Sequence, residues 1–196
     1  MFSLHRLAES SIRRKLQIAR SLPVSYKIEL DTQRGPQGLT APPGYVLDHT
    51  HGKIGRGEAA FDAAKSALRQ WKHFDLGWVR VANPEAPIAP GEVIAVEVHA
   101  LGLWSLNLSR ILYVIDEPNR FGFAYGTTPL HAERGEERFL LKYDPDSGNL
   151  SYDLLALSQP AHPLAKLAYP YTRSLQHRFA RDSVERMKRA VSDLKL

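Results

Sequence analysis

A two-residue period runs through residues 120–143 and excludes a helix for this segment. In its first half, aromatic side chains occupy every second position, with small residues between them. The aromatic residues are Phe121, Phe123 and Tyr125, and the small ones are Gly122, Ala124 and Gly126. After a loop, residues 136–143 alternate again, with Phe139, Leu141 and Tyr143 on one parity. Because successive side chains of a strand point to opposite faces, the pattern predicts two strands, each with one apolar face.

Glu137 has the same parity as the apolar side chains of the second predicted strand. A buried carboxylate without a partner is costly, so Glu137 must be paired or face a cavity. For the paired alternative, the candidate cations are Arg110, Arg120 and Arg138. For the cavity alternative, Glu137 would lie near Tyr125, and burial would raise its pKa into a range useful for acid–base chemistry. A strand shifted by one residue would instead place Glu136 inside.

The absence of cysteine excludes disulfides, thiolate catalysis and cysteine-ligated zinc or iron–sulfur sites. The 196 residues suit a single domain, 1–196, with an N-terminal helix in residues 1–22 and the core in residues 43–196. No apolar run reaches the ~20 residues that span a bilayer, and the N-terminus lacks the apolar core of a secretory signal. We therefore expect a soluble, cytoplasmic protein without a transmembrane segment. For the Arg- and Ser-rich residues 1–20, the alternative to a packed helix is a mitochondrial transit peptide.

Positive charge is concentrated at the two ends of the chain. The net charge is +5, and residues 1–20 and 171–196 each carry an excess of four positive charges. Basic helices of this kind can bind nucleic acid or anionic lipid, so an interaction protein is one alternative function. Charge along a helix is more often its solvated face, and the sequence holds no nucleic-acid recognition motif. We therefore predict no specific nucleic-acid partner.

Periodicity assigns the remaining elements. Amphipathic helices are predicted at residues 1–20, at residues 58–71 and from Pro170 to the end, where Leu175, Phe179, Val184, Met187, Val191 and Leu194 form one face. Short strands are predicted at residues 24–30, 45–49, 78–81, 93–101, 109–115 and 150–157, with a loop at residues 32–44. Strands joined by short turns pair antiparallel. The predicted fold class is α+β, with a curved antiparallel sheet that grips the long C-terminal helix and encloses a cavity.

Three weaker signals remain. The sequence GKIGRG at residues 52–57 precedes a helix but lacks the spacing of the nucleotide-binding fingerprints, so we interpret it as a tight turn. His49 and His51 would share one strand face, yet no third ligand stands at a recognisable spacing, so we predict neither a metal nor a cofactor. His131 lies in the loop between the two central strands, where functional residues are common; the alternative is an exposed histidine.

Three segments resemble an uncharacterised family: residues 44–81, which contain GYVLDHTHGKIGRG; residues 110–139, which contain FGFAYGT and GEERF; and LSQPAHP at residues 157–163. They are similar to the domain of unknown function 1990 family, also called UPF0548. Two positions depart from the family pattern. SYKIELDTQ at residues 25–33 stands where the family has Tyr-Xaa-Xaa-Val-Gly-Ala-Thr, and Leu130 replaces a glycine before the loop histidine. The element order also resembles the START and birch-pollen-allergen superfamily, which implies a helix-grip fold around a hydrophobic ligand cavity.

The predicted function is binding of a small hydrophobic or amphipathic ligand between the sheet and the C-terminal helix. The residues expected to line the site are Phe121, Phe123, Tyr125, Thr127, Arg138, Phe139 and Leu141. Glu137 or His131 would contact the polar end of the ligand. The alternative is an enzyme of the cyclase, isomerase or hydrolase type, in which Glu137 and His131 are the catalytic residues. The ligand's identity and the oligomeric state stay open.

Overall fold

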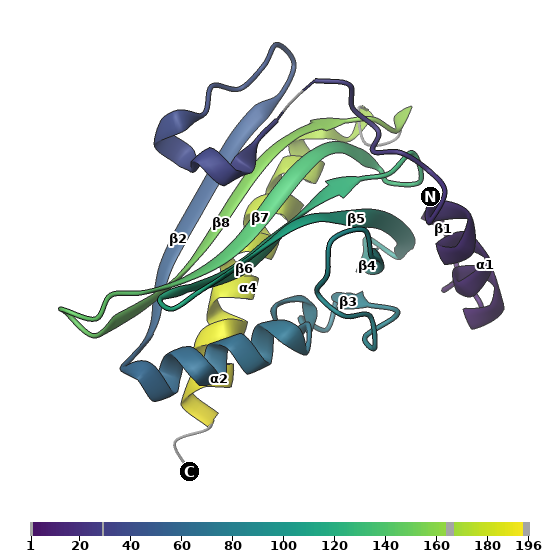
Figure 1. Cartoon of the computed structure of the whole chain (residues 1–196). Coiled ribbons are helices and arrows are strands. Elements are labelled where there is room, and N and C mark those ends of the chain that lie inside the picture. The colour runs from purple at the N-terminus through teal and green to yellow at the C-terminus, as the bar shows by residue number, and fades with distance from the viewer. Residues whose placement is uncertain (1, 29, 164–166, 194–196) are drawn as a thin grey trace.

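The computed structural model describes residues 2–28, 30–163 and 167–193 (Figure 1). In this part of the chain, eight strands form one antiparallel sheet in the order β2-β8-β7-β6-β5-β4-β3, and β1 pairs with β5. The strands are β1 Phe2–Ser3, β2 Val46–Arg56, β3 Val79–Val81, β4 Val93–Ala100, β5 Leu103–Glu117, β6 Arg120–Thr127, β7 Glu133–Tyr143 and β8 Asn149–Pro160. The helices are α1 Glu9–Ala19, α2 Glu58–Arg69 and α4 Tyr169–Ser192, with 3-10 turns η1 Thr32–Arg34, η2 Pro36–Gly38 and η3 Lys72–Phe74. The predicted α+β class, a curved antiparallel sheet with a long C-terminal helix, is confirmed.

Strands β4 to β8 pair antiparallel in sequence order, which confirms the pairing predicted for strands joined by short turns. The register of β6 and β7 places Phe121 opposite Leu141, Phe123 opposite Phe139, and Tyr125 opposite Glu137. The parity predicted for both strands is therefore correct. β7 begins at Glu133, three residues before the predicted start, because its first residues pair with the end of β8.

Helix α4 lies across the concave face of the sheet, and its second half approaches β2 closely (Figure 1). Two glycines permit this approach, since a Cβ atom at Gly52 would collide with Val184 and one at Gly55 would press against Val191. The predicted tight turn at residues 52–57 is therefore wrong for most of its length. Strand β2 continues to Arg56, and Gly57, with φ 88°, forms the turn into α2. Gly52 and Gly55 therefore allow α4 to pack closely on β2 and do not form a phosphate-binding loop.

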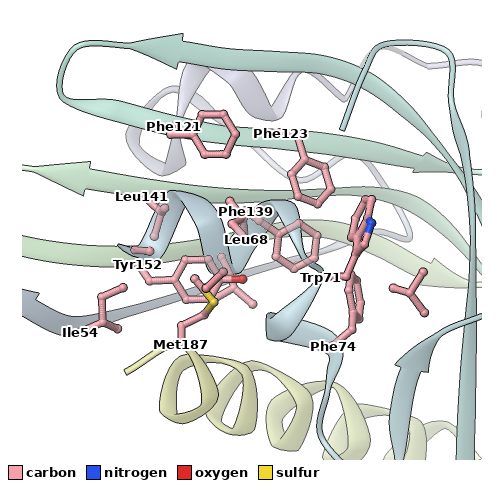
Figure 2. Packing of buried hydrophobic residues seen from close by; sticks show 14 of the residues in the cluster. Ile54, Leu68, Trp71, Phe74, Phe121, Phe123, Phe139, Leu141, Tyr152 and Met187 are labelled. Carbon is pink, nitrogen blue, oxygen red and sulfur yellow. The ribbon is translucent and has the colours of Figure 1, made fainter. Parts of the chain in front are cut away.

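The main core lies between the sheet, α2 and the second half of α4 (Figure 2). Phe123 and Phe139 are fully buried there, with ring centroids 5.2 Å apart. Trp71, at the end of α2, packs edge-on against Phe123, and its Nε1 donates to the carbonyl of Ala86 at 2.9 Å. Burial of apolar area at ~25 cal/mol per Å² makes this aromatic cluster a main source of the fold's stability.

The outer face of the sheet is covered separately. Ile12 and Ala19 of α1 pack on Val93 of β4 and on its neighbours in β5. Ile94, the next residue of β4, belongs to the main core on the other face. Helices α1 and α4 therefore lie on opposite faces of the sheet. The basic residues at the two ends of the chain thus belong to helices that do not lie side by side.

The structure differs from the predicted elements in the first thirty residues. Helix α1 begins at Glu9, because residues 2–3 pair as β1 with Ser105 and Trp104 of β5. None of the described residues in 24–30 lies in a strand; Tyr26 and Leu30 pack on the outer face instead. Leu194, the last member of the predicted C-terminal stripe, lies outside the described residues. No described helix is long and apolar enough to cross a bilayer.

Candidate functional site

A cavity of about 230 Å³ lies between the concave face of the sheet and the first half of α4. Its walls are largely apolar. They include Phe74 and Trp78, Val96 and Val98 of β4, Leu154 of β8 and Phe179 of α4. A mainly apolar cavity with a few polar groups is typical of a small-molecule site.

Small residues on two neighbouring strands leave this space open. Ala156 and Ser158 of β8 line the cavity, as does Gly135 of β7, which lies opposite Ser158. Further along the same two strands, Leu141 lies opposite Tyr152, and both side chains are fully buried. The cavity therefore results from a change in side-chain volume along one continuous sheet face.

Four residues form a row across the sheet at one side of the cavity. Tyr125, Glu137, Ala156 and Asp48 lie opposite one another on β6, β7, β8 and β2. Ala156 separates the two carboxylates, so two strand spacings, about 10 Å, lie between their backbones. The space above Ala156 is part of the cavity.

Glu137 faces the cavity and forms a hydrogen bond with Tyr125. The Tyr125 hydroxyl donates to Glu137 Oε2 at 2.5 Å. Burial raises the pKa of Glu137 to about 7; the Tyr125 hydrogen bond opposes this shift, and the charges of Glu133 and Asp48 add to it. Burial and the neighbouring Glu137 raise the pKa of Tyr125 well above its usual value. Tyr125 thus remains a hydrogen-bond donor, and Glu137 can gain or lose a proton near neutral pH.

Glu133 is a second carboxyl group on the same wall. It shares the parity of Gly135 and Glu137 on β7, and its Oε1 accepts a hydrogen bond from Gln176 Nε2 of α4 at 2.7 Å. Burial raises the pKa of Glu133 to about 7, although the Gln176 hydrogen bond and the Arg173 charge lower it in part. The cavity therefore holds two carboxyl groups that titrate near neutral pH.

The third carboxylate, Asp48, has its own counter-ion. Arg173 of α4 donates to both Asp48 oxygens, at 2.5 and 2.6 Å. His177 Nε2 lies 3.5 Å from the same carboxylate. This two-pronged ion pair joins α4 to β2 and occupies the guanidinium of Arg173.

His131 lines the cavity rather than pointing into solvent. Its Nδ1 accepts a hydrogen bond from the backbone N–H of Glu133 at 2.9 Å. Burial lowers the pKa of His131 to about 3, so the ring is neutral at neutral pH. The acceptor role of Nδ1 then puts the ring proton on Nε2.

Of the residues predicted to bind ligand, Tyr125 and Thr127 line the cavity, together with Glu137 and His131. Phe121, Phe123, Phe139 and Leu141 share the concave face, but they lie in the closed core because α2 and η3 cover that end of the sheet. Arg138 faces the outer side, where its Nη2 donates to Asp153 at 2.8 Å. These five residues are therefore not part of the cavity wall.

Among the described residues, Glu137 forms no ion pair with any of the three arginines considered from the sequence, so that alternative is wrong. Arg110 donates to the backbone carbonyls of Ala19, Arg20 and Leu22. Arg120 pairs with Glu117, and Arg138 pairs with Asp153. Glu136, the candidate for a shifted strand, points to the outer face and accepts hydrogen bonds from Thr32 and Tyr26.

The sequence interpretation missed Asp48, Glu133 and the α4 residues Arg173 and Gln176. A signal for Glu133 was present, since it shares the parity of Glu137. Arg173 and Gln176 carried no comparable signal, because their role depends on where α4 crosses the sheet. His49 and His51 share the outer face, where His49 Nε2 lies 2.7 Å and His51 Nδ1 3.9 Å from Asp153 Oδ2. Within the described ranges, no three His, Asp or Glu side chains are grouped as metal ligands.

A curved antiparallel sheet around a C-terminal helix, with a cavity between them, defines a helix-grip protein. The chain belongs to the family described as domain of unknown function DUF1990, whose model matches residues 32–186. It is 34% identical to a UPF0548 protein of Dictyostelium discoideum, over 97% of this chain and 96% of that one. It is 39% identical to a UPF0548 protein of Deinococcus radiodurans, over 71% and 75% of the two chains. The resemblance noted from the sequence is thereby confirmed.

Solved structures are similar in fold. TTHA0849 from Thermus thermophilus matches with a TM-score of 0.51 and 14% identity, over 78% of this chain and 99% of that chain. The di-domain ARO/CYC StfQ from the steffimycin biosynthetic pathway matches with a TM-score of 0.50 and 10% identity, over 77% and 52% of the chains. A START superfamily protein from Mycobacterium smegmatis has a TM-score of 0.47 and 11% identity, over 76% and 98%. Likeness at such low identity concerns the fold alone.

Proposed function

We propose that the protein binds a small, mainly apolar molecule with one polar group in the cavity beneath α4. The observation that carries the proposal is the cavity of about 230 Å³, which has aromatic and aliphatic walls and carboxyl groups on one side. An apolar molecule that leaves water for such walls gains ~25 cal/mol per Å² of buried area. The polar groups would then fix its orientation.

Native mass spectrometry tests this proposal on the freshly purified protein. A ligand from the host should travel with the folded chain and leave under denaturing conditions. Ala156→Leu should abolish this extra mass, because Ala156 borders the cavity and a larger side chain would occupy it. Ala59→Leu places the same change at an exposed position of α2 and serves as the matched control.

Exchangeable small molecules give a second test. Added apolar probes should shift the amide resonances of residues at the cavity in the wild type and not in Ala156→Leu. Binding that is unchanged in Ala156→Leu would contradict the proposal, provided that the variant unfolds at the temperature of the control.

A second candidate function is proton-transfer catalysis on the bound molecule. The Glu137–Tyr125 pair favours it, since a carboxyl with a pKa of about 7 can both accept and donate a proton at neutral pH. Glu137→Gln should then abolish turnover of the recovered ligand and leave its binding intact. Turnover that survives this substitution would exclude Glu137 as the acid or base.

A further inference from the structure

The charges around the cavity are not balanced. The charged or titratable residues that line it are Asp48, Tyr125, His131, Glu133, Glu136, Glu137 and His177. The carboxylate of Glu136 is bound on the outer face by Thr32 and Tyr26, and Arg173 adjoins the cavity through its ion pair with Asp48. Arg173 is the only permanent cation of this group, and its guanidinium is bound to Asp48. Neither Glu133 nor Glu137 forms an ion pair with a residue in the described ranges 2–28, 30–163 and 167–193.

Both glutamates keep acceptor capacity. Glu137 uses Oε2 for the Tyr125 hydroxyl, and Glu133 uses Oε1 for Gln176. The other oxygen of each carboxyl accepts no hydrogen bond from the described residues. Because an ionised carboxylate only accepts hydrogen bonds, the group that satisfies these oxygens must be a donor.

The strand position between the two glutamates, Gly135, carries no side chain of its own. The Gln176 amide of α4 reaches its edge, where Nε2 donates to Glu133 Oε1 at 2.7 Å and to Ser158 Oγ, opposite Gly135, at 3.1 Å. Glu133, Gly135 and Glu137 follow one another on the same face of β7, and all three line the cavity. At ~3.3 Å per residue, the backbones of the two glutamates lie about 13 Å apart, with only the glycine between them. A Cβ atom at Gly135 would collide with the backbone carbonyl of Leu157, so this position stays bare.

Aromatic rings complete the surroundings. Phe74 stacks on Phe179 with ring centroids 5.4 Å apart and on Tyr125 with centroids 6.4 Å apart, and all three residues line the cavity. Aromatic faces attract cations as well as apolar groups. The same wall can therefore receive a hydrocarbon body and the positive charge attached to it.

Building on the proposed ligand-binding function, we infer that the ligand is a hydrophobic amine whose ammonium group lies between Glu133 and Glu137. The ammonium donates to the two unused carboxylate oxygens, and its hydrocarbon body packs against Phe74 and Phe179. An alcohol supplies a donor but no charge, and a carboxylate adds a third uncompensated negative charge. Among ligands that share one hydrocarbon body, affinity should therefore be highest for the amine, lower for the alcohol and lowest for the carboxylate.

Three probes that share a phenyl ring test this ranking: 2-phenylethylamine, 2-phenylethanol and 3-phenylpropanoate. Each is titrated into the full chain at pH 8, above the pKa of about 7 that burial gives both glutamates, and followed by protein NMR. The amine should bind about tenfold more tightly than the alcohol, and the carboxylate should bind most weakly. Glu137→Gln and Glu133→Gln should each weaken amine binding about tenfold and leave the alcohol almost unchanged.

The controls separate charge from fold. Glu137→Asp keeps the charge and should keep the order of preference. Glu85→Gln removes an exposed carboxylate that does not line the cavity and should change nothing. Equal binding of amine and alcohol, or no effect of the two Gln variants on the amine, would overturn the amine assignment while apolar binding stands. If none of the three probes binds, the ligand-binding function itself fails.

Discussion

Two successive pairs on β6 and β7 have opposite surroundings. Phe123 and Phe139 are fully buried in the aromatic core, whereas Tyr125 and Glu137, the next pair along, border the cavity. Both pairs lie on the same strands and the same face. At the first end of the face, residues of α2 and η3 pack against Phe123 and Phe139 (Figure 2). At the second end, the small residues Gly135 and Ala156 leave space beneath the first half of α4. Alternation along a strand therefore determines the face, and the covering elements and the small residues beneath them determine whether that face is closed.

The closed end should respond most strongly to loss of volume. Phe139→Ala is expected to lower the free energy of unfolding by about 3–5 kcal/mol, because the surrounding aromatic rings cannot collapse into the space. Phe179→Ala, on the cavity wall, should cost only about 1 kcal/mol, since that ring already borders open space. Urea unfolding of both variants measures the difference. Equal losses would mean that the two ends are packed alike.

The second half of α4 is also closed, through its contact with β2. Gly52→Ala should destabilise the protein by about 1–3 kcal/mol, because the new methyl group collides with Val184. Val184→Ala removes the obstructing methyl groups, so the double variant should recover part of the loss. A double-mutant cycle by thermal unfolding gives the coupling between the two positions. Additive losses would refute the close contact.

Local periodicity explains what the sequence predicted well. The parity of residues 121–125 and 137–143 depends on neighbouring residues alone, and both the pairing and the inward position of Glu137 followed from it. Which of those inward residues meet a ligand depends on volume at Gly135 and Ala156 and on where α4 crosses. The partners Asp48 and Arg173 come from segments 125 residues apart. No local pattern encodes that register, so the candidate site was predicted only in part.

A buried histidine should make the stability of the closed end depend on pH. His73 is fully buried against Phe74 and Phe139, and neither ring nitrogen has a hydrogen-bond partner among the described residues. Burial lowers its pKa from 6.5 to about 3. Between these values the unfolded chain binds the proton and the folded chain does not, so stability falls as the pH falls.

His73→Leu should remove this sensitivity. From pH 7 to pH 5, the wild type should lose on the order of 2 kcal/mol more than the variant does. Urea unfolding at both pH values gives the comparison, with His5→Leu as an exposed control. A wild type and variant with parallel pH profiles would show that His73 does not titrate differently on unfolding.

At the open end, the stability should change with pH in the opposite direction. Burial raises the pKa of Glu137 from 4.5 to about 7, so between these values the folded protein holds a proton that the unfolded chain releases. This contribution to stability is complete below pH 4.5 and is lost as the pH rises through 7. Glu137→Gln should therefore reduce the decline in the free energy of unfolding between pH 5 and pH 8, as measured by urea unfolding. A smaller decline should remain in the variant, because Glu133 titrates in the same direction. An unchanged decline would mean that water reaches Glu137 freely, and the contrast between a closed and an open end would then rest on packing volume alone.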